Sequence, residues 1–107
     1  MNPVRYTLNG TATGSTVLMD YLANPFCVGI GCVATGTVTY SVQHTFDTLS
    51  AIVAGTATYF NNENITAASS SQSTNYAFPV MGIRLNITAA AVNGSVAITI
   101  IQATKPT

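Results

Sequence analysis

Charge is what this sequence has least of. Only 6% of its 107 residues are Asp, Glu, Lys or Arg, against about 25% in an ordinary soluble domain, and the formal net charge is zero. A chain without a basic run neutralises few phosphates and has no electrostatic attraction to an anionic bilayer. We therefore expect no nucleic-acid partner and no membrane partner.

A long apolar run is also missing, and so is a recognisable export signal. No apolar segment approaches the roughly 18 residues of a membrane helix. Residues 1–7 lack the basic stretch and following apolar stretch of a signal peptide. We expect a protein that is made in the cytoplasm and is not exported by the usual route.

Few residues are suited to acid–base or nucleophilic chemistry. The single histidine, His44, precedes Asp47 by three positions, and in an extended strand two such side chains point to opposite faces. No Gly-x-Ser-x-Gly elbow exposes a serine, and no motif pairs the carboxylates of Asp20, Asp47 and Glu63. We predict no catalytic residue, and we expect His44 at the rim of a core face with a hydrogen-bonded partner.

The two cysteines are limited by their spacing. Within one strand, Cys27 and Cys32 would point to opposite faces about 16 Å apart, beyond the roughly 7 Å limit between the Cα atoms of a disulfide. Because only His44 offers a third nitrogen or sulfur ligand, the pair is also a poor zinc site. We expect two free thiols, no metal and no cofactor.

Alternation with a period of two dominates the rest of the sequence. In residues 37–46 every second residue is apolar or aromatic, which is typical of a strand with one buried face. Residues 81–87 and 96–100 alternate in the same way on either side of Asn93-Gly94, which predicts a β-hairpin. Further strands are expected at about residues 4–10, 15–20, 26–34 and 56–60.

The segments between these strands predict loops rather than helices. Residues 48–55 and the polar residues 67–75 are expected to be exposed loops, and residues 61–66 at most a single helical turn. The fold class that follows is all-β. We predict a single antiparallel β-sandwich or jelly-roll-like domain of six to eight short strands over residues 1–107, with a short N-terminal arm.

Arg84 interrupts an apolar strand, on the face opposite Ile83 and Leu85. If that face is open to solvent, the guanidinium is simply hydrated. If it packs against another element, an acid has to lie near, and Asp47 is the first candidate. We predict an Arg84–Asp47 ion pair that holds two strands together.

Aromatic residues offer a second feature to interpret, although the chain has no Trp. Such residues form sugar platforms in carbohydrate-binding modules, but at strand positions Tyr and Phe more often belong to a core or an interface. With 48% hydrophobic residues and a mean hydropathy of +0.38, the chain is expected to leave apolar area that another surface covers. The aromatic residues considered are Tyr6, Tyr21, Tyr40, Tyr59, Phe60, Tyr76 and Phe78.

Several segments together resemble a family of small virion proteins of tailed bacteriophages. The most specific are Tyr-x-Val-Gln-His-Thr-Phe-Asp at residues 40–47 and Ile-Arg-Leu-Asn-x-Thr at residues 83–88. The sequence departs from the family pattern at Cys27, where a polar residue is usual, and at Tyr59, where Trp is expected. The remaining similar segments are residues 24–30, 36–39, 58–60, 76–82 and 94–102.

The resemblance implies a capsid decoration protein, also called a cement or staple protein, with a jelly-roll-like fold. Its partners would be the major capsid protein and other copies of itself, as a homodimer or another homo-oligomer. It would lie on the outer capsid surface of the virion, and in the host cytoplasm during assembly. A phage tail or baseplate accessory protein, a carbohydrate-binding module and a small hydrolase remain alternatives. The candidate interface residues are Met1, Asn2, Pro3, Val4, Arg5, Tyr6, Tyr59, Phe60, Tyr76 and Phe78.

Overall fold

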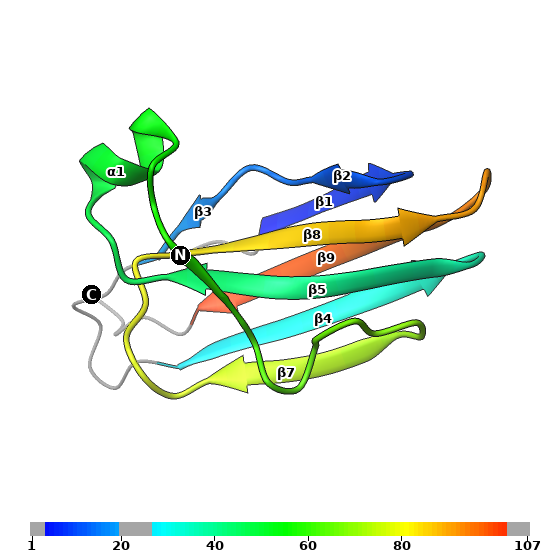
Figure 1. Ribbon diagram of the computed structural model, residues 1–107. Coiled ribbons are helices and arrows are strands. Elements are labelled where there is room, and N and C mark those ends of the chain that lie inside the picture. The colour runs from blue at the N-terminus through cyan, green and yellow to red at the C-terminus, as the bar shows by residue number, and fades with distance from the viewer. Residues whose placement is uncertain (1–3, 20–26, 103–107) are drawn as a thin grey trace.

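Two antiparallel sheets face each other in the computed structural model, which describes residues 4–19 and 27–102 (Figure 1). One sheet has the strand order β1-β9-β4-β7; in the other the order is β2-β8-β5-β6, and β3 also pairs with β8. The prediction of an all-β sandwich is therefore confirmed. The elements are β1 (Val4–Asn9), β2 (Ala12–Thr13), β3 (Val17–Leu18), β4 (Val28–Thr35), β5 (Val38–Thr45), α1 (Leu49–Ala54), β6 (Tyr59–Asn61), β7 (Gln72–Tyr76), β8 (Gly82–Ala90) and β9 (Ser95–Gln102).

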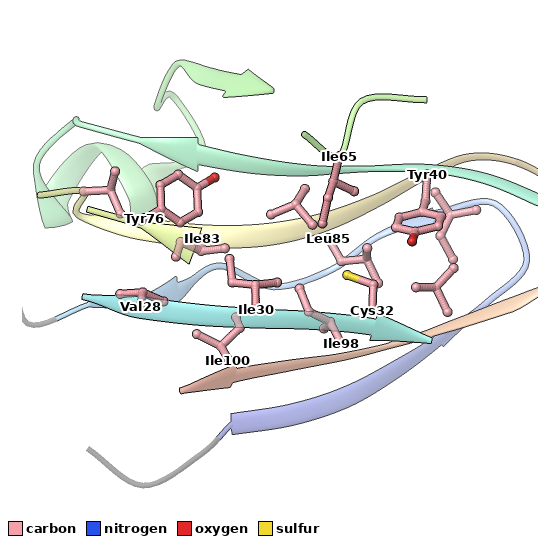
Figure 2. Packing of buried hydrophobic residues seen from close by; sticks show 14 of the residues in the cluster. Val28, Ile30, Cys32, Tyr40, Ile65, Tyr76, Ile83, Leu85, Ile98 and Ile100 are labelled. Carbon is pink, nitrogen blue, oxygen red and sulfur yellow. The ribbon is translucent and has the colours of Figure 1, made fainter. Parts of the chain in front are cut away.

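The core lies between the two sheets and is built from alternate residues of the long strands. On β8 the inward side chains are Ile83, Leu85 and Ile87, each with at most 1% of its surface exposed. Burying such a side chain contributes about 1.5–3 kcal/mol, so these rows are the main stabilising contacts. Figure 2 shows the rows meeting between the sheets, with the rings of Tyr76 and Tyr40 at opposite ends of the core.

The turn at Asn93-Gly94 does not close a β-hairpin, and that prediction is wrong. Strand β8 pairs with β5, β2 and β3, whereas β9 pairs with β1 and β4 in the other sheet. The turn instead carries the chain from one layer of the sandwich to the other (Figure 1). Two strands with one apolar face each bury those faces equally well as neighbours in one sheet or as opposite members of two packed sheets. Alternation alone therefore does not distinguish a hairpin from a crossing between sheets.

Two predicted loops contain regular structure. Residues 48–55 include α1, where the Thr48 hydroxyl accepts from the amide of Ala51 and Gly55 ends the helix in the left-handed conformation. The second half of residues 67–75 belongs to β7, an edge strand of polar residues paired with β4. The described residues form nine strands rather than six to eight, because β2 and β3 are short pieces along β8.

Candidate functional site

His44 lies near the end of β5, at the rim of the core face, as the alternation predicts. Its side chain is 7% exposed, and its Nδ1 shares a hydrogen bond of 2.8 Å with the hydroxyl of Tyr76 on the opposite sheet. Burial lowers the pKa of His44, because the imidazolium form would lose its hydration. Burial also raises the pKa of Tyr76 to about 12. Both side chains are therefore neutral near pH 7.

Four aromatic rings surround this imidazole. The ring centroids of Tyr76, Phe46, Phe78 and Phe60 lie 5.1, 5.4, 5.7 and 6.0 Å from that of His44. Phe60 faces His44 directly across the β5–β6 pair, and Phe46 continues the inward parity of β5 beyond the end of the strand. We call His44, Phe46, Phe60, Tyr76 and Phe78 the aromatic cluster.

The aromatic cluster is open to solvent on one side. Phe46, Phe60 and Phe78 are 53%, 51% and 47% exposed, which is a high value for phenylalanines although the ring of Phe46 contacts the other two. They line one wall of a groove with a volume of about 570 Å³. We call this groove the aromatic groove; its lining residues are His44, Phe46, Phe60, Asn61, Asn62, Glu63, Asn64, Asn75, Ala77 and Phe78.

The other wall of the aromatic groove is polar. It consists of the turn after β6 and the last residues of β7, so the groove lies where the margins of the two sheets meet. Asn62 is buried, and its Oδ1 accepts hydrogen bonds from the amide of Asn64 and the hydroxyl of Thr74. Nδ2 of Asn64 also donates to Thr74. These bonds hold the polar wall in place beneath its exposed side chains.

The predicted Arg84–Asp47 ion pair is not formed between these described residues. Nε of Arg84 donates to Oε1 of Gln43 at 2.8 Å, and the guanidinium carbon lies 3.5 Å from the centre of the Tyr59 ring. The carboxylate of Asp47 instead accepts from the backbone amide of Thr58. A cation–π contact and a neutral amide thus take the place that the sequence interpretation assigned to an acid.

The predicted interface residues have different environments. Met1, Asn2 and Pro3 lie outside the described residues, and Val4, Arg5 and Tyr6 belong to β1. Tyr6 is partly buried, and its hydroxyl accepts from the amide of Leu85.

Among the remaining candidates, Phe60 and Phe78 are exposed in the aromatic groove, and Tyr59 is partly buried beneath Arg84. Tyr76 is fully buried, so its assignment to an interface is wrong. Tyr76 is the last residue of β7, an edge strand that the sequence interpretation did not predict. Without that strand, there was no predicted face on which to place its side chain in the core.

Both thiols are free in the described chain. Cys27 is exposed just before β4, and Cys32 points into the core, which agrees with the parity argument. Burial raises the pKa of Cys32 to about 12, so this thiol is unreactive in the folded protein. Within the described residues, no three His, Cys, Asp or Glu side chains gather as a metal site would require. No helix there is long and apolar enough to cross a membrane.

Sequence reasoning placed Phe46 and Phe60 on strands but did not bring them together with the polar residues of the groove. Glu63 and Asn75 were assigned to a turn and a loop. Both residues line the aromatic groove because β7 pairs with β4, and this pairing brings residue 75 close to the turn after β6. The position of Phe46 could have been predicted from the sequence. Phe46 follows His44 by two residues, so its side chain points to the same face of the strand, at the same end of the core.

No protein-family model and no curated protein sequence matches the chain. Among solved structures, it is similar to a subunit of the appendages of Bacillus endospores, described as a family of disulfide-linked pili. The TM-score is 0.50 and the sequence identity 21%, and the similarity covers 98% of this chain and 87% of the other. At this identity the likeness establishes the fold class, and it agrees with the two antiparallel sheets described above.

Proposed function

We propose that this chain is a non-enzymatic structural protein that works by packing against other protein subunits, including copies of itself. The observation that carries the proposal is the outer face of the four-stranded sheet. Val33 on β4 and Ile101 on β9 are exposed there, Gly29 and Gly31 add no side chain along β4, and the hydroxyl of Thr99 between them accepts from Arg5. A flat, weakly charged surface loses little hydration when another protein covers it.

The more specific role that we propose is capsid decoration. The support is the resemblance of residues 40–47 and 83–88 to the small phage virion proteins, together with the sandwich fold that the resemblance implies. In this role the protein binds major capsid subunits on the outside of a phage head and stabilises the shell. Contacts with several subunits at once raise the effective concentration of each and slow their separation.

A second candidate role is that of a filament subunit, and the pilus subunit with the similar fold favours it. Among the described residues, β1 and β7 form the two margins of one sheet, and each pairs with a neighbour on one side only. A head-to-tail contact between two different margins does not close on itself and generates a fibre. In this role Cys27, the exposed thiol, is the one available to link copies covalently.

Immunogold electron microscopy of particles from the producing cells distinguishes these roles. Label on phage heads supports decoration, label along fibres supports the filament role, and label on tails replaces both with the tail-accessory alternative. If the protein sediments as a monomer at all concentrations and labels no assembly, the structural role itself is wrong.

A matched pair of variants tests the surface that carries the proposal. Val33→Asp places a charge on the outer face of the four-stranded sheet and should weaken self-association or binding to shells. Val92→Asp makes the same change in the turn between β8 and β9, away from that face, and should leave binding unchanged. Equal effects of both substitutions, measured by sedimentation velocity, would remove the outer face from the proposal.

A further inference from the structure

The outer face of the four-stranded sheet shows an ordered distribution of side-chain size. It is carried by β4 and β9, the two central strands, in which every second side chain points outward. The outward residues of β4 are, in chain order, Gly29, Gly31, Val33 and Thr35. Those of β9 are Ser95, Ala97, Thr99 and Ile101. In each strand the first two outward residues are therefore small and the last two are branched.

Because the two strands are antiparallel, the small half of one lies beside the branched half of the other. Gly31 pairs with Thr99, and Val33 pairs with Ala97. Val33 and Ile101 are exposed and stand above the face, whereas a Cβ at Gly31 would meet no described heavy atom within 4 Å. The face is thus divided into four quarters that alternate diagonally. We call the small halves of the two strands the low quarters and the branched halves the raised quarters.

This alternating pattern fits a copy of itself. A two-fold axis in the plane of contact, either across the strands or along them between β4 and β9, places every raised quarter of one copy against a low quarter of the other. Gly31 then faces Val33 of the second copy if the axis crosses the strands, and Thr99 of the second copy if the axis runs along them. Packed sheets interlock their side chains in this way at a separation of about 10 Å. The relief of the face therefore favours the same face of a second copy over an unrelated surface.

The charge on this face agrees with contact between two copies. Arg5 on β1 is the one charged side chain of the face among the described residues, and its Nε donates to the hydroxyl of Thr99. Either axis places Arg5 opposite a hydroxyl of the second copy, that of Thr7 or that of Ser73, and not opposite its own equivalent. Like charges therefore do not meet across the contact.

The face is also large enough for a specific contact. Strands β1, β9, β4 and β7 have six, eight, eight and five residues. At about 3.3 Å per residue and about 4.8 Å between strands, they cover roughly 430 Å² in each copy. Two copies then bury roughly 900 Å² in projection, and the relief of the side chains brings this close to the total of about 1,000 Å² that a specific interface needs.

We infer that this outer face binds the same face of a second copy, with Val33 and Ile101 seated over the low quarters. The inference rests on the proposed structural function and identifies one partner surface within it. Burial of the exposed branched side chains supplies the affinity, and the alternation of the quarters sets the register. The outer edges of β1 and β7 and the aromatic groove lie outside this contact and stay available to other subunits.

Sedimentation velocity of the full chain over a range of concentrations tests the contact. We expect the wild-type protein to form dimers. Gly31→Val should weaken the dimer by about tenfold or more, because it fills a low quarter and the contact occurs twice in a two-fold pair. The open space above Gly31 accommodates the new side chain within a single copy. Ala89→Val, which enlarges an exposed strand residue of the other sheet, should leave the dimer unchanged.

A second substitution distinguishes overpacking at this contact from any other effect of the valine. Gly31→Val combined with Val33→Ala should restore the dimer to within about threefold of the wild type if the axis crosses the strands. Gly31→Val combined with Thr99→Ala should do so if the axis runs along the strands. In each case the second change removes the side chain that the new valine meets. Restoration by either one supports the inference and identifies the axis.

Three outcomes would overturn the inference. They are a monomer at every concentration, a dimer that Gly31→Val weakens no more than Ala89→Val does, and a weakened dimer that neither second substitution restores. Circular dichroism shows whether each variant is folded. If Gly31→Val is unfolded, Gly29→Val replaces it, with Thr35→Ala or Ile101→Ala as the second substitution, because a Cβ at Gly29 lies 4.0 Å from the carbonyl oxygen of Ile101. A chain that labels phage heads or fibres but fails these tests leaves the proposed function intact.

Discussion

Removing the hydroxyl of Tyr76 should destabilise the protein far more than its small size suggests. Tyr76 has no exposed surface, and its hydroxyl bonds to His44, which is itself 7% exposed. Tyr76→Phe therefore deletes the hydrogen bond to His44, together with the hydroxyl's bond to Asn62, and leaves Nδ1 of His44 without a partner away from water. The lost bond to His44 contributes about 0.5–1.5 kcal/mol, and the unsatisfied nitrogen costs about 1–3 kcal/mol. We expect a loss of about 2 kcal/mol, or about 10 °C in Tm for a domain of this size.

The measurement is urea unfolding followed by circular dichroism, with Tyr59→Phe as the matched control. The Tyr59 hydroxyl bonds to Thr16 where both residues are only partly buried, so water replaces the lost partner and the cost should stay below about 1 kcal/mol. In a double-mutant cycle, His44→Phe combined with Tyr76→Phe should cost clearly less than the sum of the single changes. Equal losses at Tyr76 and Tyr59, or an additive cycle, would refute the reasoning.

Three further results are expected. First, because the folded pKa of His44 is below its ordinary value of 6.5, the unfolded chain binds the proton more tightly, so stability is full above pH 6.5 and falls as pH drops through the folded pKa. Urea midpoints between about pH 7.5 and pH 5 should show this loss, and His44→Phe should lack it. Second, a thiol reagent should modify Cys27 in the folded protein but Cys32 only after unfolding, because Cys32 is buried with a pKa of about 12. Rapid modification of both would contradict this placement. Third, Gly94→Ala should destabilise strongly, since its Cβ would lie 2.6 Å from the carbonyl oxygen of Thr37. Gly31→Ala, with open space around its Cβ, should be neutral or stabilising by about 0.4–1 kcal/mol in thermal unfolding.

Local information was enough to predict the strands and the faces that they bury. The alternation in residues 37–46 predicted β5 and the inward side chains of Val38, Tyr40 and Val42, which are at most 2% exposed. Parity also separated Cys27 from Cys32 and placed His44 at the rim of the core. These features depend only on the geometry of an extended chain, in which successive side chains point to opposite faces.

The partners of these strands and side chains were decided by the tertiary structure. Strand β9 crosses to the other sheet although its pattern also suits a hairpin with β8, and Arg84 contacts Tyr59 and Gln43 although Asp47 is charged. The aromatic groove depends on segments that approach one another only when β6 and β7 take their places at the margins of the two sheets. The sequence by itself therefore determined which face of each strand is apolar, because that follows from local geometry. Which apolar faces meet depends on how the whole set of strands buries most area at once, and only the assembled sandwich decides it.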